Sequence, residues 1–172
     1  MTDIAPRVAD RTSGPEALAR AAMAKVDAHD LDGLRAAWHP DLELHFVATG
    51  KHVNRDGARA EFAEIFAAFP DFRIAPTGVL ADGDTAIVEW VGHGSHTGAA
   101  YQGIARTGRR IELRGVDLMQ FSDGLLWRNT VYYDGLSVAR GLGLLPPDGT
   151  AQDRAVKGLF NVITRLRRLI RR

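Results

Sequence analysis

The spacing of apolar and polar residues along the chain predicts helices first and strands afterwards. Between residues 15 and 69 the apolar positions mostly recur every three or four residues, which is the spacing of one face of an α-helix. Between residues 72 and 133 apolar and polar positions mostly alternate, as they do on the two faces of a β-strand. This order predicts an α+β domain in which helices cover one face of a bent sheet.

Capping residues set the bounds of the expected helices. Ser13, Pro15 and Glu16 have the pattern of a capping box with proline in the first turn, which begins a helix. Asp30 and Asn54 are the expected caps of the second and third helices. The expected helices are residues 14–29, 31–38, 55–69 and 136–144.

Runs of alternating residues predict the strands. They are residues 42–46, 72–80, 85–94, 109–121 and 126–133. Asp-Gly turns join the second run to the third and the fourth to the fifth, as in an antiparallel meander. In the run 85–94, alternation leaves two inner rows open: Ala86, Val88 and Trp90, or Ile87, Glu89, Val91 and His93.

The hairpin made by the last two runs holds one acidic residue in mid-strand, Asp117. A tight two-residue turn would place Asp117 opposite Thr130 and would bring Asp134 onto the same face. A type I turn with Gly124 as a bulge residue adds one residue and places Asp117 opposite Val131. We favour the second register, because it also sets Arg114 across from Asp134 as an ion pair.

In the favoured register one face of the hairpin surrounds Asp117 with mostly apolar side chains. This face consists of Leu113, Gly115, Asp117, Met119, Phe121, Trp127, Asn129, Val131 and Tyr133. Such a face is typical of a small-molecule cavity, and poor solvation would raise the pKa of the carboxyl group there. The alternative is that Asp117 only accepts a hydrogen bond from Asn129 or Tyr133 in a structural network.

Composition predicts one domain between two terminal segments. A chain of 172 residues that is 45% hydrophobic can bury one core. Residues 1–12 have no apolar run, so we expect a disordered leader that is neither a secretory signal nor a membrane span. The domain is expected at 13–149 and a basic amphipathic helix at 150–172. The absence of cysteine excludes disulfides and thiolate chemistry, and we expect a cytoplasmic protein.

The C-terminal segment differs in charge from the rest of the chain. Residues 151–172 hold seven basic residues and one acid, a net charge of +6, which leaves −5 for residues 1–150. Apolar residues recur there at helical spacing. We expect this helix to dock on the domain or on a partner subunit, and the alternative is peripheral contact with an anionic membrane. The acidic body argues against a nucleic-acid partner.

Residues that could hold a metal or a cofactor lack the required spacing. His93 and His96 are three apart in or after a strand, and no acid or third histidine follows at metal-ligand spacing. Gly92, Gly94 and Gly98 do not lie between a strand and a helix, as a dinucleotide-binding loop would. We therefore expect no metal site and no cofactor.

Several short motifs resemble those of one protein family. They are Trp38-His39-Pro40-Asp41, Phe69-Pro70-Asp71, His96-Thr97-Gly98, Arg106-Thr107-Gly108-Arg109, Val116-Asp117-Leu118-Met119, Asp123-Gly124 and the segment from Asp134 to Pro146. Over residues 15–146 the chain resembles the SnoaL-like polyketide cyclases of the nuclear-transport-factor-2-like superfamily. The resemblance implies a cone-shaped α+β barrel with a curved antiparallel or mixed sheet and N-terminal helices on its concave side. It also implies a homodimer and a cofactor-free aldol closure of a polyketide ester.

The resemblance also implies two functional positions, and the chain departs from the family at both. The cyclase histidine that helps hold the substrate falls on Asp117, and the catalytic aspartate falls on Val131. Our enzyme hypothesis is that Asp117 acts as general acid or base on a hydrophobic polycyclic or polyketide-like molecule, while Tyr133 and Asn129 donate hydrogen bonds to the developing oxyanion. The expected substrate-binding residues are Trp90, Leu113, Met119, Phe121, Trp127, Val131, Leu44, Phe46 and Phe66.

Two alternatives use the same fold. One is a binding protein in which Asp117 orients a ligand without turnover. The other, weaker one is an epoxide hydrolase, which needs a second buried acid and an arginine to activate water. Asp134 could supply that acid only in the rejected register.

Overall fold

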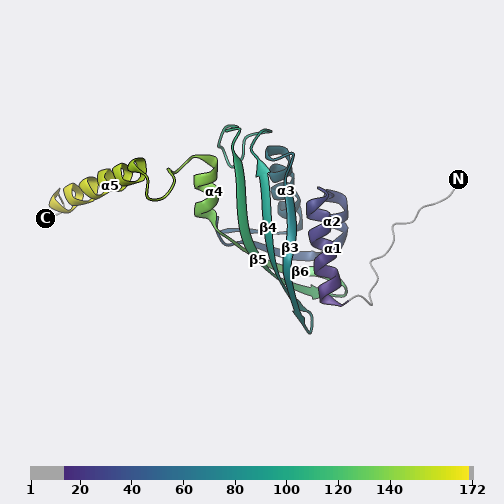
Figure 1. Ribbon diagram of the computed structural model, residues 1–172. Coiled ribbons are helices and arrows are strands. Elements are labelled where there is room, and N and C mark those ends of the chain that lie inside the picture. Colours follow the sequence, from purple (N-terminus) through teal and green to yellow (C-terminus); the bar gives the residue numbers. More distant parts are fainter. Residues whose placement is uncertain (1–13, 171–172) are drawn as a thin grey trace.

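The computed structural model describes residues 14–170, with the side chains of residues 169 and 170 left out (Figure 1). The expected leader, residues 1–12, lies outside the described residues, as does Ser13. The described helices are α1 (Pro15–Asp27), α2 (Leu31–Ala37), α3 (Arg55–Ala68), α4 (Gly135–Leu142) and α5 (Ala151–Ile170). The described strands are β1 (Trp38–Phe46), β2 (Lys51–Val53), β3 (Arg73–Asp82), β4 (Thr85–Ser95), β5 (Arg110–Ser122) and β6 (Leu125–Tyr133).

The described strands form a single mixed sheet in the order β2-β1-β6-β5-β4-β3. Strands β3 to β6 make the predicted antiparallel meander, and β1 pairs parallel with β6. Figure 1 shows the N-terminal helices on one side of the bent sheet, where α1 packs on β3, β4 and β5 and α3 packs on β1. The predicted α+β class with helices on the concave side of a curved sheet is therefore confirmed.

Two of the three predicted caps are present. Asp30 Oδ1 accepts the backbone N–H of Gly33 at 2.8 Å, and Asn54 Oδ1 accepts that of Gly57 at 3.0 Å. The prediction for α1 was wrong in its cap, because Gly14 is the N-cap and no side chain caps it. Pro15 follows as the first helical residue, where its fixed φ suits a helix start.

The sheet also contains pairing that alternation did not predict. Strand β2 has only three residues, too few for an alternating pattern. Strand β1 was expected to begin at Leu42, but it begins at Trp38. Trp38 pairs with Leu126, and the next paired residue is Glu43, so Pro40 lies in an irregular stretch without a pairing partner. Proline cannot donate to a ladder, so it is tolerated in a strand at such a position.

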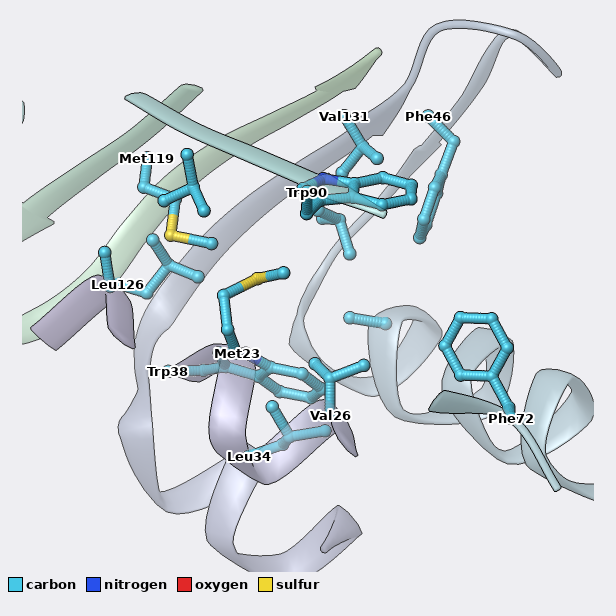
Figure 2. Close-up of a cluster of buried hydrophobic side chains, with 14 of the residues drawn as sticks. Met23, Val26, Leu34, Trp38, Phe46, Phe72, Trp90, Met119, Leu126 and Val131 are labelled. Carbon is cyan, nitrogen blue, oxygen red and sulfur yellow. The ribbon is translucent and has the colours of Figure 1, made fainter. Parts of the chain in front are cut away.

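The inner row of β4 is the first of the two alternatives. Ala86, Val88 and Trp90 are buried, and Ile87 and Glu89 face outward. Figure 2 shows side chains of α1, among them Met23 and Val26, facing side chains of the sheet such as Trp90 and Val131. The core therefore lies between the N-terminal helices and the concave face of the sheet.

The predicted register of the β5–β6 hairpin is confirmed, since Asp117 pairs with Val131. The predicted turn was wrong. Ser122 pairs with Leu125, and the two turn residues Asp123 and Gly124 have φ of +52° and +76°, as in a two-residue type I′ turn. The extra residue that shifts the register is Trp127. Leu126 pairs with Phe121 and Arg128 pairs with Gln120, so Trp127 between them has no partner and forms a β-bulge.

This bulge changes the position of Trp127. Leu126 takes the inner position opposite Phe121, and Trp127 leaves the face that carries Asp117. The guanidinium carbon of Arg128 lies 4.6 Å from the centroid of the Trp127 ring. The expectation that Trp127 belongs to the inner face was wrong, because a bulge reverses the facing of the residue it contains.

The expected ion pair between Arg114 and Asp134 was also wrong. Strand β6 ends at Tyr133, and Asp134 is the N-cap of α4. Its carboxylate accepts the backbone N–H groups of Leu136 and Ser137 at 3.0 Å, and the Ser137 hydroxyl also donates to it. Hydrogen bonds from Ser137 hold the pKa of Asp134 below its usual range. A carboxylate at a helix N-terminus is a stable arrangement, and it competes with the cross-strand pair.

The Asp134→Ala substitution is expected to lower the urea midpoint of unfolding, because the first turn of α4 loses its acceptor. Arg114→Ala is the matched control and is expected to leave the midpoint unchanged. Urea denaturation followed by circular dichroism measures both. Equal losses in the two variants would show that the cross-strand pair forms after all.

Candidate functional site

A cavity lies between the concave face of the sheet and helices α1 and α3, with a free volume of about 100 Å³. Its walls are mostly apolar. The lining residues are Met23, Val26, Phe46, Thr49, Glu61, Phe62, Ile65, Phe69, Phe72, Ile74, Trp90, Tyr101, Gln102, Ile111, Leu113, Asp117, Val131, Tyr133 and Val138. An apolar hollow with a few polar groups is the usual form of a small-molecule site.

Asp117 is the buried charged group of this cavity, with 7% of its surface exposed. Its Oδ1 accepts a hydrogen bond from Trp90 Nε1 at 2.8 Å, and its Oδ2 accepts one from Asn129 Nδ2 at 2.8 Å. Burial raises the pKa of Asp117 to about 6. The hydrogen bonds from Asn129 and Trp90 favour the charged form and lower the pKa, but they offset the effect of burial only in part. Near this pH the group can both take up and release a proton.

The contact between Trp90 and Asp117 depends on a glycine. Gly115 pairs with Trp90 across β4 and β5. A Cβ atom on Gly115 would lie 2.3 Å from Trp90 Cζ2 and 2.5 Å from the backbone oxygen of Tyr132. The missing side chain therefore leaves the space in which the indole ring lies while its N–H reaches Asp117, two residues further along β5.

Polar groups also gather at the mouth of the cavity, which is marked by the exposed residues Thr49 and Gln102. Burial raises the pKa values of the Tyr133 and Tyr101 hydroxyls above their usual range, so both remain neutral donors at physiological pH. Glu61 is ion-paired with Lys51, with 2.5 Å between Oε1 and Nζ. The cavity thus has a carboxyl group inside and hydroxyl groups towards its mouth.

The structure brings together only some of the predicted site residues. Those that line the cavity are Phe46, Trp90, Leu113, Asp117, Val131 and Tyr133. Three others, Leu44, Met119 and Asn129, border a smaller neighbouring cavity of about 30 Å³. The two cavities share Met23, Val26, Phe62 and Asp117, whereas Leu34 and Trp38 line only the smaller one.

The remaining three predicted residues lie outside both cavities. Phe121 is buried near the hairpin turn, and Trp127 occupies the bulge. Phe66 packs in the core, where its ring stacks on His29 with 4.1 Å between the ring centroids. Alternation along a strand predicts which face of the sheet a side chain lies on. It does not predict how much of that face the helices cover, so some residues on the predicted face do not line the cavity.

Sequence reasoning assigned only Phe66 of α3 to the site, and it missed Phe62 and Ile65 of the same helix and the 96–108 loop. Phe62 and Ile65 have the helical spacing of a buried face, which could have assigned them to the lining. Tyr101 and Gln102 lie in an irregular loop held by a bridge between Tyr101 and Ile104. No periodic pattern in the sequence marks that loop.

No histidine of residues 14–170 lines either cavity. His96 is completely buried, its Nε2 lies 3.0 Å from the backbone oxygen of Ala99, and its ring stacks on Phe69. Across residues 14–170, no group of three or more histidine, aspartate and glutamate side chains is placed to hold a metal ion.

The curved mixed sheet, the helices on its concave face and the apolar cavity between them define an α+β protein of the small-molecule-binding class. Within that class, the pattern of the SnoaL-like domain family matches residues 19–129, which is most of the chain. The protein therefore belongs to the SnoaL-like domain family, as the motifs predicted. A comparison with functionally curated proteins finds no significant match.

Solved structures share the fold at low sequence identity. AclR from Streptomyces galilaeus, a proposed hydroxylase, is 20% identical with a TM-score of 0.71, over 89% of this chain and 96% of AclR. IdmH from Streptomyces antibioticus, a proposed polyketide cyclase, is 22% identical with a TM-score of 0.67, over 76% of this chain and 99% of IdmH. TerC, crystallised with polyporic acid, is 18% identical with a TM-score of 0.62, over 76% of this chain and 98% of TerC. At these identities the likeness shows the fold alone.

The Gly115→Ala substitution is expected to displace the Trp90 indole and break its hydrogen bond to Asp117. The cost should be about 1–3 kcal/mol of unfolding free energy, because a methyl group is forced into filled space. Gly78→Ala in β3 is the control, since a Cβ atom there meets only Glu89 at 3.7 Å or more. Denaturation and tryptophan fluorescence measure both variants. An equal, small effect in the two would contradict the account of Gly115.

The raised pKa of Asp117 predicts how stability varies with pH. The folded protein keeps a proton on Asp117 up to about pH 6, whereas the unfolded chain releases it near 3.8. The unfolding free energy of the wild type should therefore fall relative to Asp117→Asn as pH rises from about 4 to about 6, by about 3 kcal/mol. Denaturation of both proteins across this range measures the difference. A difference that stays flat or grows would contradict the raised pKa.

Proposed function

We propose that this protein performs acid/base chemistry, without a cofactor, on a hydrophobic polyketide-like small molecule, with Asp117 as the catalytic residue. The observation that carries the proposal is one buried carboxyl group, held by two donors and facing an apolar cavity. Burial raises its pKa to about 6, which suits a group that takes and returns protons. Membership of the SnoaL-like family supports a small-molecule substrate.

The reaction that a single base supports is proton transfer at carbon. The Asp117 carboxylate would remove a proton from a carbon next to a carbonyl group and become a carboxylic acid, while the electron pair moves to the carbonyl oxygen. In a substrate whose enolate is conjugated with a carbon–carbon double bond, the electron pair returns from oxygen to the far carbon of that system. That carbon takes the same proton from Asp117, which shifts the double bond and completes an isomerisation. A single positioned base contributes roughly a hundred- to ten-thousand-fold. Val131 occupies the position of the cyclase aspartate, so the aldol closure of the cyclases lacks its usual acid here.

The hydrogen-bond donors proposed for the oxyanion differ from those expected from the sequence. Asn129 was expected to donate to the substrate, but its amide N–H donates to Asp117 and it borders the smaller cavity. Asn129 is therefore proposed as a positioning residue, together with Trp90. The hydroxyl groups of Tyr133 and Tyr101 are neutral and line the cavity, so they are the better candidates to stabilise an oxyanion.

The size of the cavity constrains the ligand. A free volume of about 100 Å³ is smaller than the several hundred Å³ of sites that enclose a drug-sized molecule. We propose that one ring of a larger ligand reaches Asp117 and that the rest lies at the mouth, beside Thr49 and Gln102. The crystallisation of TerC with polyporic acid supports a small-molecule role for this fold.

A binding protein without turnover is the second candidate. Both oxygens of Asp117 already accept hydrogen bonds from Trp90 and Asn129, as in a structural network. The epoxide hydrolase reading is not supported, because Asp134 caps α4 at the surface. In the part of the chain that the structure describes, the cavity lining also contains no arginine. The homodimer and the cytoplasmic location stay predictions.

Hydrogen exchange at carbon tests the proposed chemistry without knowledge of the natural substrate. β-Tetralone, a two-ring ketone with acidic C–H groups, is incubated with the protein in D₂O, and NMR follows both exchange and binding. The wild type is expected to accelerate exchange, and the rate should rise as pH increases through about 6, since the base is the charged form. Asp117→Asn should lose about a hundredfold or more of this rate and keep its affinity for β-tetralone.

Glu61→Gln is the control for a second carboxyl group in the same cavity, and it is expected to keep most of the exchange rate. Equal exchange by the wild type and Asp117→Asn would refute the catalytic role. A third outcome would favour the binding protein: the wild type binds β-tetralone without accelerating exchange, and Asp117→Asn binds it more weakly.

A further inference from the structure

Helix α5 presents an apolar face that no other segment of the described residues covers. Figure 1 shows α5 extending away from the sheet and the N-terminal helices. Its large apolar side chains are between 39% and 67% exposed: Val156, Leu159, Phe160, Val162, Ile163 and Leu166. Within residues 14–170, no other helix or strand packs substantially against α5. The expectation that this helix docks on its own domain was therefore wrong.

Most basic residues of α5 lie on the half of the helix opposite its apolar residues. At about 100° per residue, the apolar side chains spread over roughly half of the circumference. Arg154, Lys157, Arg165 and Arg168 occupy the other half, whereas Arg167 falls within the apolar half, between Val156 and Phe160. Arg171 and Arg172 continue the basic sequence beyond the described residues.

The single acidic residue of the helix does not offset this charge. Asp153 accepts hydrogen bonds from Lys157 Nζ at 2.6 Å and from the backbone N–H of Gly149 at 3.1 Å. It thus completes the first turn, and the arginines of the later turns are left without an acidic neighbour on the same helix. The helix is a cationic amphipathic element with its charge concentrated towards its C-terminal end.

We propose that α5 lies flat on an anionic lipid bilayer. The apolar half would enter the boundary between headgroups and acyl chains, and the basic residues would remain at the level of the lipid phosphates, where long side chains can extend to the anionic groups. In residues 14–170, no helix is both long and apolar enough to cross a bilayer, so contact through α5 would be peripheral. This proposal does not depend on the chemistry at Asp117.

Two features favour a bilayer over a second copy of the chain. Pairing of two α5 helices through their apolar halves would leave the basic halves without anionic partners, because the one acid of each helix is already engaged by Lys157. The apolar half is also wider than the narrow seam by which two helices pair. A flat apolar layer under a negatively charged surface matches both the width of this face and its charge.

Flotation with lipid vesicles tests the proposal on the full chain. Vesicles of phosphatidylcholine with about 30% phosphatidylserine are expected to bind the wild type at least roughly tenfold more strongly than phosphatidylcholine alone. About 0.5 M sodium chloride should weaken this binding, because salt screens the attraction. Leu159→Ser/Ile163→Ser should lose roughly tenfold or more of it, since two apolar groups leave the face.

The matched control is Asn161→Ser/Thr164→Ser, which introduces the same residue type on the polar half and should bind like the wild type. Urea unfolding of both variants should match the wild type, because α5 stands apart from the core. The proposal is overturned if the wild type does not prefer anionic vesicles, or if both double variants lose binding equally. It is also overturned if Leu159→Ser/Ile163→Ser changes the sedimentation mass and leaves vesicle binding unchanged, because a second copy would then cover the helix.

Discussion

The burial of the Asp117 carboxyl group is the constraint on which the rest of the site depends. A charged carboxylate is costly to remove from water unless it is hydrogen-bonded, and Trp90 and Asn129 supply those bonds from the two strands beside β5. Each donor reaches Asp117 only in the observed register of β4, β5 and β6. The curvature of the sheet, the absence of a side chain at Gly115 and the bulge at Trp127 all contribute to that geometry.

The same hydrogen bonds connect the protonation of Asp117 with the orientation of the Asn129 amide. Asn129 Nδ2 donates to Asp117, whereas Asn129 Oδ1 is buried without a hydrogen-bond partner among residues 14–170. A half-turn of the amide would let Oδ1 accept a hydrogen bond from the O–H of a neutral Asp117. The site therefore has one arrangement suited to each protonation state, which is what a group that exchanges protons needs.

Sequence patterns predicted the elements of the fold and the pairing of Asp117 with Val131, because both follow from local alternation and turn residues. They misplaced Trp127 and Asp134, since a bulge and a helix cap depend on competition between neighbouring backbone groups that alternation does not record. The depth of the cavity, set by helices α1 and α3, and the contribution of the 96–108 loop arise from tertiary packing. The amphipathic character of α5 was evident in its sequence, but its separation from the domain was not.

The concave face of the sheet keeps one carboxyl group poorly solvated beside an apolar cavity. A carbon-13 NMR titration of the Asp117 side-chain carboxyl, assigned by comparison with Asp117→Asn, measures this most directly. The expected midpoint is near pH 6, well above the ordinary value of 3.8. A midpoint at or below 3.8 would contradict it, because the carboxylate would then be as well stabilised in the folded protein as in water.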